Sequence, residues 1–518
     1  MLIDARSLPQ NTVIESDLCI IGAGTAGITL AREFMQTDFR VAIVESGGLL
    51  PDRETQSLYH GANVGLPYYP LKDARARFFG GSSHRWHVDL GGGALGTRLR
   101  PLDPLDFEKR DWVPYSGWPL SKDSLDLFYE RAEEICRVTP AGFELADWGD
   151  PIDRPSLPLD DRQIQTCIYK FGTRDLFADT YPNEVASAEN IATYLYANAL
   201  EVHTKRDTSA VTHVHCGALH GNNFQVRSKI YVLSLGGLET PRLLLLSRSQ
   251  HANGLGNAND LVGRFFMEHP HFWSGVYFPK GRRPFSRTHL YDRIHYVNQI
   301  PIVGKLVVCP DLQRQERLLN QNIQLIPQTA SPGVCFAGSK SAGQGFINKA
   351  VRRLRRLSAK MLSPARPCFK LANMMEQVPN PESRVKLASD RDQFNQNRLI
   401  LDWRVTEQDI SSAKRTQEIL RSAIHRAGLG SVCIQLQEGR VPDRIHGGYH
   451  HMGTTRMHEN ERLGVVDENS RVHGSSNLYI AGPSVFPTVG YANPVLTIVA
   501  LTVRLADHVK EIMKRGAE

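Results

Sequence analysis

Short apolar runs alternate with one amphipathic stretch near the N-terminus. The run over 17–21 is short and apolar, as in a buried parallel strand. A glycine-rich turn over 22–27 follows it, and apolar residues then recur at helical spacing up to Phe34. A second apolar run over 40–44 ends in Glu45. The pattern predicts a strand, a turn, a helix and a second strand, as in a β–α–β unit.

A stretch without charged residues lies near the C-terminus. It runs from Leu478 to Val503 and is long enough to cross a bilayer. However, Pro483, Pro487 and Pro494 interrupt it, and a helix does not continue through such positions. The sequence therefore predicts a buried strand, a loop and then a helix after Pro494, and no transmembrane segment.

Composition narrows the class of protein. With 518 residues, of which 41% are hydrophobic, the chain can bury a large core and should form two domains or one elaborated domain. The formal charge of +7 is small for this length, so nucleic-acid binding is not expected. The eight cysteines form no CxxC pair, which disfavours a metal site and fits free thiols in a reducing compartment. No secretory leader is visible, and a cytoplasmic location is expected.

The glycine-rich turn has the GxGxxG spacing of a dinucleotide-binding site. Gly22 permits a tight turn, Gly24 lets the backbone approach a pyrophosphate, and Gly27 allows close packing of helix on strand. The N-terminus of the helix would stabilise phosphate charge. Glu45 follows Gly27 by 18 positions and could accept hydrogen bonds from ribose hydroxyls. A tight turn without ligand is the alternative, and the motif alone does not distinguish FAD from NAD.

Further blocks downstream carry a resemblance to a known family. They are Phe79-Gly80-Gly81-Ser82-Ser83, a strand-and-turn block over 232–241, Gly453-Thr454, and Ala492-Asn493-Pro494. Together with the N-terminal turn they resemble the glucose–methanol–choline (GMC) oxidoreductases, which are FAD-dependent alcohol oxidases and dehydrogenases. The resemblance covers residues 17–47, 75–138, 197–271, 375–409 and 446–508.

The resemblance implies an α/β fold with two domains. One is a Rossmann-like FAD-binding domain built from discontinuous segments, and the other is an inserted sheet-plus-helix (α+β) substrate domain. The expected limits are 1–270 for the N-terminal and middle segments of the FAD-binding domain and 271–440 for the substrate-binding domain. A C-terminal segment, 441–518, would complete the FAD domain and the active site.

The resemblance also implies a catalytic pair. The family's catalytic histidine stands three residues before the glycine of the Gly-Thr pair, which is His450 here and not His451. The partner position matches Asn493. His450 would take the hydroxyl proton as a general base, Asn493 would position the alcohol oxygen, and a hydride would pass from the alcohol carbon to flavin N5. Pro494 would start a final helix whose N-terminus points at the flavin.

FAD is the expected cofactor, bound without a covalent link. The position of the family's linking histidine holds Arg85, and His84 and His87 flank it out of register. Val202 belongs to a strand whose backbone would contact the adenine. The expected cofactor-binding residues are Gly22, Gly24, Thr25, Ala26, Gly27, Glu45, Gly80, Gly81, Ser83, Val202, Gly482, Asn493 and Pro494.

Three further roles are weaker expectations. Glu376 is either an active-site carboxylate or a structural partner of Arg384, and the structural role is preferred. His269 is interpreted as a structural histidine. The basic stretch 349–360 is either a solvated surface helix or a weak contact with a membrane surface or an acidic acceptor protein.

The expected partners are a small-molecule alcohol and an electron acceptor. A sugar, a sterol, an aryl alcohol or a specialised metabolite is compatible with the motifs, and the acceptor is oxygen or a dye, quinone or protein. The alternative functions are an FAD-containing lyase and a non-catalytic flavoprotein of the same fold.

Overall fold

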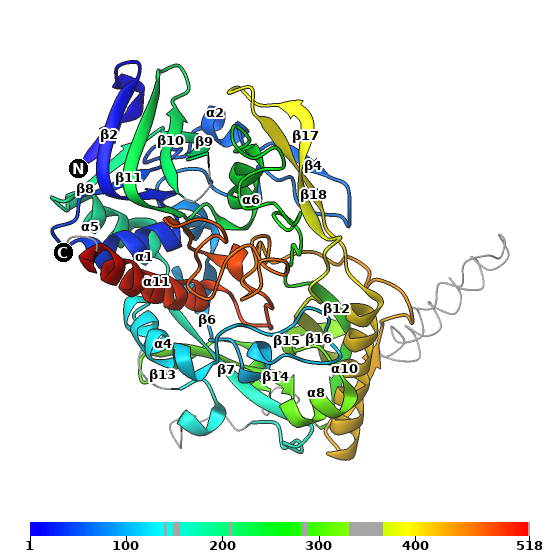
Figure 1. The fold of residues 1–518 in the computed structure, drawn as a ribbon. Coiled ribbons are helices and arrows are strands. Elements are labelled where there is room, and N and C mark those ends of the chain that lie inside the picture. Colours follow the sequence, from blue (N-terminus) through cyan, green and yellow to red (C-terminus); the bar gives the residue numbers. More distant parts are fainter. Residues whose placement is uncertain (139–141, 149–155, 207–209, 282–287, 331–365, 516–518) are drawn as a thin grey trace.

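The structure is a computed structural model that describes residues 1–138, 142–148, 156–206, 210–281, 288–330 and 366–515. In these ranges the chain forms two large sheets and one small sheet, with helices packed on them (Figure 1). The predicted α/β fold is confirmed. The basic stretch 349–360 lies outside the described residues.

The first large sheet has a parallel core, in the order β1-β8-β3-β2-β11-β10-β9, with β20 also paired to β11. The first five strands of this order and β20 are parallel to their neighbours, whereas β10 is antiparallel to β11 and to β9. The strands are β1 (Leu2–Asp4), β2 (Thr12–Ile21), β3 (Val41–Val44), β8 (Ile191–Leu195), β9 (Asn198–Thr204), β10 (Val211–Gly217), β11 (Asn223–Leu233) and β20 (Leu478–Ile480).

Both sequence patterns form the predicted elements. The N-terminal pattern forms β2, α1 (Thr25–Phe34) and β3, and the two strands are parallel neighbours. The charge-free C-terminal stretch forms β20, a 3-10 turn η6 (Pro483–Val485) and α11 (Val495–Arg515). The first half of α11 is buried because it packs against α1 and α4 (Asp123–Ile135). Figure 1 shows α11 in red alongside α1.

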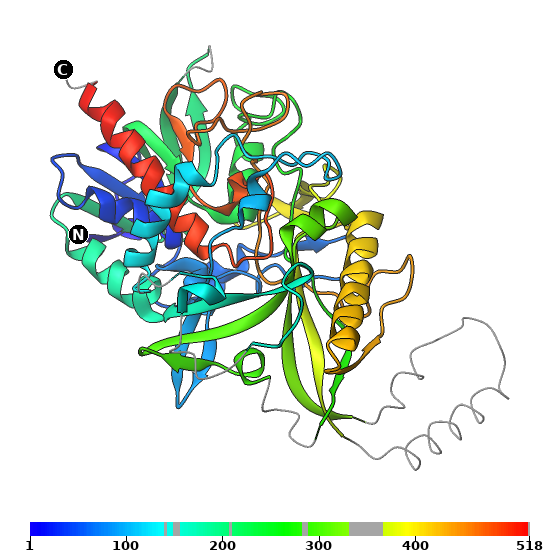
Figure 2. The ribbon, with the colours of Figure 1, turned by 90° about the horizontal axis from the view of Figure 1, so that it is seen from below.

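The second large sheet is antiparallel, in the order β19-β12-β16-β15-β14-β7-β6-β5, with β13 paired to β14. One face is covered by α10 (Glu407–Arg426), as Figure 2 shows. The other face meets the loop before α11, because Tyr491 packs among its side chains. The strands are β5 (Val88–Gly91), β6 (Ala94–Leu99), β7 (Ile164–Thr173), β12 (His271–Pro279), β13 (His295–Val297), β14 (Ile300–Val308), β15 (Gln321–Ala330), β16 (Arg366–Met375) and β19 (Gly430–Ile434).

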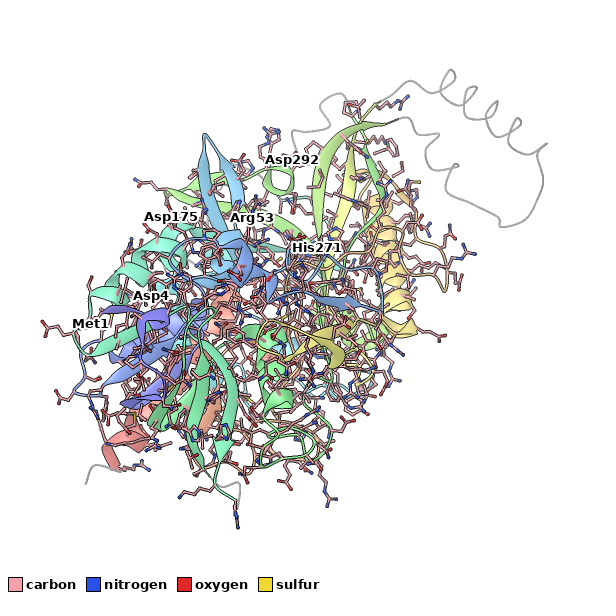
Figure 3. The ribbon with its side chains drawn as sticks, turned by 90° about the horizontal axis from the view of Figure 1, so that it is seen from above. Met1, Asp4, Arg53, Asp175, His271 and Asp292 are labelled. Carbon is pink, nitrogen blue, oxygen red and sulfur yellow. The ribbon has the colours of Figure 1, made fainter. Side chains whose placement is uncertain are left out.

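A small sheet of β17 (Arg384–Arg391), β18 (Asn397–Asp402) and β4 (Gly61–Asn63) joins distant parts of the chain. Figure 3 shows His271, the first residue of β12, toward the centre of the molecule, with Met1 and Asp4 at its periphery. The remaining helices are α2 (Arg53–Ser57), α3 (Pro104–Phe107), α5 (Tyr181–Ser187), α6 (Gly236–Leu246), α7 (His289–Asp292) and α8 (Pro310–Glu316), with the short turns η1 (Ala5–Ser7), η2 (Gly81–Arg85), η3 (Leu145–Trp148) and η4 (Leu176–Thr180).

The sheets divide the chain differently from the expected limits 1–270, 271–440 and 441–518. Strands β5, β6 and β7 lie before residue 271 but belong to the second sheet. Strand β4 also lies before residue 271 but pairs with β18, which lies after it. An apolar pattern predicts a strand but not which sheet it joins, because pairing depends on hydrogen bonds between distant segments. The domain limits themselves stay a prediction.

The thiols are not all free. Among the described residues Cys19, Cys136, Cys167, Cys216 and Cys309 are free, whereas Cys433 is disulfide-bonded. The expectation of free thiols is therefore wrong for Cys433, and the cytoplasmic location stays a prediction. No described helix is long and apolar enough to cross a membrane.

Candidate active site

The glycine-rich turn is held by Glu45, which follows β3. Its carboxylate accepts hydrogen bonds from Ala23 N–H at 2.9 Å and from Gly47 N–H at 2.8 Å. Gly22 has φ +100°, and a Cβ there would lie 2.8 Å from the carbonyl oxygen of Ser234. The turn therefore needs glycine at its first position, and the acid after β3 fastens the turn to the sheet.

The second and third glycines of the turn have different surroundings. A Cβ on Gly27 would lie 2.0 Å from the carbonyl oxygen of Gly22, so helix and strand touch there. A Cβ on Gly24 would meet no atom within 4 Å. Beside it, the buried hydroxyl of Thr25 has no hydrogen-bond partner in the described part of the chain. These features leave room and a free donor at the N-terminus of α1, where an anionic group is stabilised.

A cavity with about 900 Å³ of empty space opens from this turn. It is lined by segments that are far apart in the sequence. Of the expected cofactor-binding residues, those on the cavity wall are Gly22, Gly24, Thr25, Ala26, Glu45, Gly81, Gly482 and Pro494. Residues on the wall that the sequence did not single out include Ser46, Tyr59, Arg75, Ser82, Trp86 and Tyr449.

The other expected cofactor-binding residues are not on the cavity wall; they are Gly27, Gly80, Ser83, Val202 and Asn493. Gly80 N–H donates to the carbonyl of Ala23 at 2.9 Å, and Ser83 Oγ donates to the carbonyl of Gly80 at 2.7 Å. Val202 N–H donates to Ser247 Oγ at 3.0 Å. Gly80 thus braces the second glycine turn against the first, Ser83 closes the second turn, and Ser82 rather than Ser83 lies on the cavity wall.

His450 and Asn493 meet although 43 positions separate them in the sequence. Asn493 Nδ2 lies 3.2 Å from His450 Nε2. The Oδ1 atom of Asn493 is buried and has no hydrogen-bond partner among the residues described. His450 lines the cavity beside Gly482 and Pro494. The Nδ2 group of Asn493 has two N–H donors, so it can donate to a hydroxyl oxygen beside the imidazole nitrogen.

A third histidine decides which nitrogen of His450 carries the proton. His269 is fully buried, and its Nε2 lies 3.1 Å from the carbonyl oxygen of Val489, so Nε2 must be the N–H donor. Burial lowers the pKa of His269 to about 4, so the ring is neutral and its Nδ1 is an acceptor. That Nδ1 lies 2.9 Å from Nδ1 of His450. His450 therefore carries its proton on Nδ1, and its unprotonated Nε2 accepts a hydrogen bond from Nδ2–H of Asn493.

Glu268 holds the backbone around His450. It is fully buried, and its carboxylate accepts hydrogen bonds from the N–H groups of Gly448, His450 and His269 at 2.9–3.1 Å and from the hydroxyl of Tyr68. Burial raises the pKa of Glu268 to about 7, against the opposite effect of these donors. The sequence analysis missed Glu268, whose only signal was its position before His269.

His451 also lines the cavity but has other partners. Its Nε2 lies 2.8 Å from the hydroxyl of Tyr68, which itself donates to Glu268. Burial lowers the pKa of His451 to about 3. His450, in contrast, has a pKa lowered well below its usual value by burial and then by the neighbouring His269. Both rings are neutral, and only His450 is hydrogen-bonded to Asn493.

His84 and Arg85, at the expected linking position, are hydrogen-bonded to backbone carbonyls. His84 Nε2 lies 3.0 Å from the carbonyl oxygen of Phe79 and donates to it, while Arg85 donates to the carbonyl of Asp73. Neither residue, nor His87, is on the cavity wall. This arrangement agrees with a cofactor held without a covalent link.

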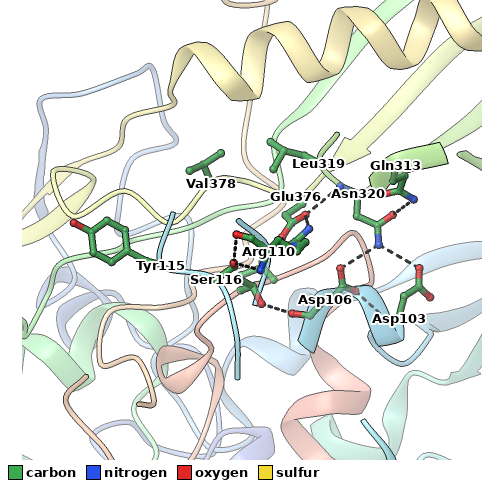
Figure 4. Close-up of polar contacts among 12 residues, drawn as sticks. Asp103, Asp106, Arg110, Tyr115, Ser116, Gln313, Leu319, Asn320, Glu376 and Val378 are labelled. Carbon is green, nitrogen blue, oxygen red and sulfur yellow. Dashed lines mark hydrogen bonds and ion pairs between the residues drawn. The ribbon is translucent and has the colours of Figure 1, made fainter. Parts of the chain in front are cut away.

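Glu376 has a structural partner, but the expected partner Arg384 is wrong. Its carboxylate pairs with Arg110 through both oxygens, and both side chains are fully buried (Figure 4). Arg384 instead pairs with Asp260 at 2.9 Å. Asn320 N–H also donates to Glu376, at 3.0 Å. Sequence distance misled the prediction, because the partner of Glu376 comes from a segment 266 positions away.

Comparison with known proteins agrees with this geometry. A family model described as GMC oxidoreductase matches residues 379–502. The large subunit of fructose dehydrogenase from Gluconobacter japonicus is 22% identical, with 98% of this chain and 100% of that protein covered. The 2-methyl-1,2-propanediol dehydrogenase of Mycolicibacterium austroafricanum is 24% identical over 96% of this chain and 95% of its own length. A crystal structure of formate oxidase shares the fold at a TM-score of 0.58, with 16% identity over 98% of this chain and 100% of that one.

Proposed function

We propose that the chain is a GMC oxidoreductase, an FAD-dependent enzyme acting on alcohol donors, and that it oxidises a CH–OH group to a carbonyl with His450 as the general base. The observation that carries the proposal is the position of His450 on the cavity wall, with its Nε2 3.2 Å from Nδ2 of Asn493. Alcohol oxidation needs a proton acceptor beside the hydroxyl, and this nitrogen is one.

The residues at the glycine turn fit FAD. The open space at Gly24, the unpaired hydroxyl of Thr25 and the N-terminus of α1 would hold the pyrophosphate, and Glu45 lies where a ribose would follow. When bound, FAD supplies the acceptor for the hydride of the alcohol carbon. Pro494 immediately precedes α11, whose N-terminal N–H groups favour negative charge at that end of the cavity.

The proton path runs through side chains of this chain. An alcohol hydroxyl entering the site would donate to Nε2 of His450 in place of the bond from Asn493, and an N–H of the Asn493 amide would donate to the alcohol oxygen. When His450 takes the proton, its Nδ1–H remains bonded to His269, which keeps the ring oriented. His269 is thus a positioning residue in this proposal.

The visible spectrum of the purified protein tests the proposal. Flavin absorbance that bleaches anaerobically with at least one of a panel of sugars, sterols and aryl alcohols supports it. Bound flavin that no alcohol reduces would favour a lyase or a non-catalytic flavoprotein. Acid precipitation should release the flavin into the supernatant, and peroxide release measured against dye reduction would show whether oxygen is the acceptor.

Alanine at Gly24 should weaken FAD binding, whereas alanine at Gly27 should lower the stability of the fold. Gly24→Ala adds a Cβ in open space, so the FAD-free protein should keep its stability while FAD binding weakens about tenfold or more. Gly27→Ala forces a Cβ against Gly22 and should destabilise the fold by about 1–3 kcal/mol or more. Thermal unfolding of the FAD-free protein and fluorescence titration with FAD separate the two. Equal FAD affinity in Gly24→Ala would contradict the assignment of this turn.

Variants of His269 test the positioning role. His269→Asn keeps an acceptor near the place of Nδ1, whereas His269→Leu removes it. The rate of flavin reduction by alcohol should fall about 10- to 100-fold in the leucine variant and much less in the asparagine variant, with little change in alcohol affinity. Histidine-selective ¹⁵N NMR would show the His450 proton on Nδ1 in the wild type. A proton on Nε2 there would contradict the argument.

The pH dependence should report Glu268. Its raised pKa of about 7 means that Glu268 is ionised above that pH and neutral below it. When neutral, its carboxyl group is a weaker acceptor for the backbone N–H groups around His450. The pKa of His450 lies too low to titrate in this range. Flavin reduction should therefore slow as pH falls through about 7, and Glu268→Gln should remove that pH step. An identical step in the glutamine variant would assign it to another group.

A further inference from the structure

Three basic side chains from different strands share one face of the second sheet, opposite α10. They are Arg98 on β6, Lys305 on β14 and His271 on β12. Arg98 is paired across the sheet with Phe171, and Lys305 with Cys167, and both partners belong to the cluster that packs around Tyr491. We call Arg98, Lys305 and His271 the basic face.

Arg98 carries a charge without a counter-charge. Its Nε atom is buried without a hydrogen-bond partner, and no carboxylate of the described chain pairs with its guanidinium. Its guanidinium carbon lies 5.8 Å from the ring centre of Phe171. Since an arginine does not lose its proton in proteins, the charge is permanent.

Lys305 also has no carboxylate partner among the described residues. The side chain is 2% exposed, and Nζ donates to Asn322 Oδ1 at 3.0 Å and lies 4.4 Å from the ring centre of Tyr169. An ammonium has three donors, and none of them meets a carboxylate in the described residues. Burial lowers the pKa of Lys305 well below its usual value, so its charged form here needs an anion nearby.

His271 connects the basic face with the catalytic base. Its Nε2 is buried and has no hydrogen-bond partner among the residues placed by the structure. Its ring centre lies 6.4 Å from that of His450 and 5.4 Å from that of His446. The basic face therefore begins next to the cavity wall on which His450 lies.

Other buried arginines show how this chain usually treats such charges. Arg75 pairs with Glu239, Arg110 with Glu376, and Arg242 with Asp392. A buried charge without a partner is strongly destabilising, and the half-buried Arg98 differs from these three arginines because no carboxylate of the described residues pairs with it.

We propose that the basic face binds an anionic oxygen group, a carboxylate or a phosphate, carried by the alcohol substrate. Arg98 and Lys305 would neutralise the anion, and the free Nε2 of His271 would donate to it, while the carbinol of the same molecule reaches His450. The inference rests on the proposed function, and it names the substrate class as alcohols that also bear an acidic group. Such a substrate would restore the counter-charge that the fold lacks.

The test uses matched neutral and anionic probes on the FAD-loaded enzyme at constant ionic strength. Benzoate should perturb the flavin absorbance with about 10- to 100-fold higher affinity than benzamide. Likewise, 4-(hydroxymethyl)benzoate should reduce the flavin at lower concentration than 4-(hydroxymethyl)benzamide. Glucose 6-phosphate against glucose, and glucuronate against glucose, then distinguish phosphate from carboxylate.

Variants assign the preference to the basic face. Arg98→Gln and, separately, Lys305→Met should each reduce the anion preference about tenfold or more, while Arg227→Gln, which removes an exposed charge on β11, should leave it unchanged. Arg98→Lys keeps the charge and should retain part of the preference if Arg98→Gln folds poorly.

Equal binding of benzoate and benzamide by the wild type would overturn the inference. A second result would also overturn it: an Arg98→Gln variant whose flavin reduction potential changes while its anion preference does not. The charge of Arg98 would then stabilise the reduced cofactor rather than the substrate. Benzoate binding is measured without turnover. Anion binding with no alcohol oxidation would therefore reject the proposed function alone, and oxidation of neutral alcohols without anion preference would reject this inference alone.

Discussion

Replacing His450 with glutamine should slow anaerobic reduction of the bound flavin by alcohol about 1,000-fold, within the range for loss of a general base. The reason is that Nε2 of His450 is the unprotonated nitrogen beside Asn493, whereas Nδ1–H is bonded to His269. A glutamine can occupy the space but does not accept a proton near neutral pH. Stopped-flow absorbance of the flavin measures the rate, and the absorbance before mixing shows that FAD is still bound.

His451→Gln is the matched control for this prediction. His451 is the adjacent residue, is equally buried and lines the same cavity, but its Nε2 is bonded to Tyr68. Its loss should slow reduction far less than the loss of His450. If His451→Gln had the larger effect with FAD still bound, the base would have to be reassigned to His451.

Replacing Arg110 with methionine should destabilise the protein by about 3–5 kcal/mol, the largest effect on stability expected for a single change here. The substitution leaves the carboxylate of Glu376 buried without its arginine, although both side chains are fully buried in the wild type. Glu376 would keep only the N–H donor of Asn320. Urea unfolding of the FAD-loaded protein, followed by tryptophan fluorescence, measures the loss.

The double variant Arg110→Met/Glu376→Leu is the control. It removes both charges, so it should recover a large part of the stability, apart from the unpaired N–H of Asn320. No recovery would show that the methionine variant fails through packing rather than through the lone charge. The pair also supports the loop before α11. Asn320 and Arg110 lie around Asp106 (Figure 4), and Asp106 leaves room only for glycine at position 490 of that loop.

The parts of the site that the sequence predicted are local. Gly22, Gly27 and Glu45 lie within one β–α–β unit, so their spacing alone brings them together. The helix after Pro494 was likewise predictable, since proline and the apolar run before it mark its start. Even within these segments the backbone decides details: Ser82 faces the cavity, and Ser83 donates to Gly80 behind it.

The roles of His269 and Glu268 could not be predicted in the same way. Both lie a few residues before β12, and their contacts with His450 span more than 180 positions. No periodicity or spacing encodes which nitrogen of a ring faces which acceptor. The same holds for Glu376, whose partner lies 266 positions away and not at the nearby Arg384.

The sequence by itself determined the glycine turn and the order of elements in the first unit, because these depend on residue type and short spacing, whereas the candidate base and its amide partner came from the resemblance to the GMC family. Only the tertiary structure decided that His269 leaves Nε2 of His450 unprotonated, that β5, β6 and β7 join the second sheet, and that Arg98 and Lys305 share a face without a carboxylate. The physical reason is that hydrogen-bond direction, burial and charge pairing arise between segments that meet only when the chain folds.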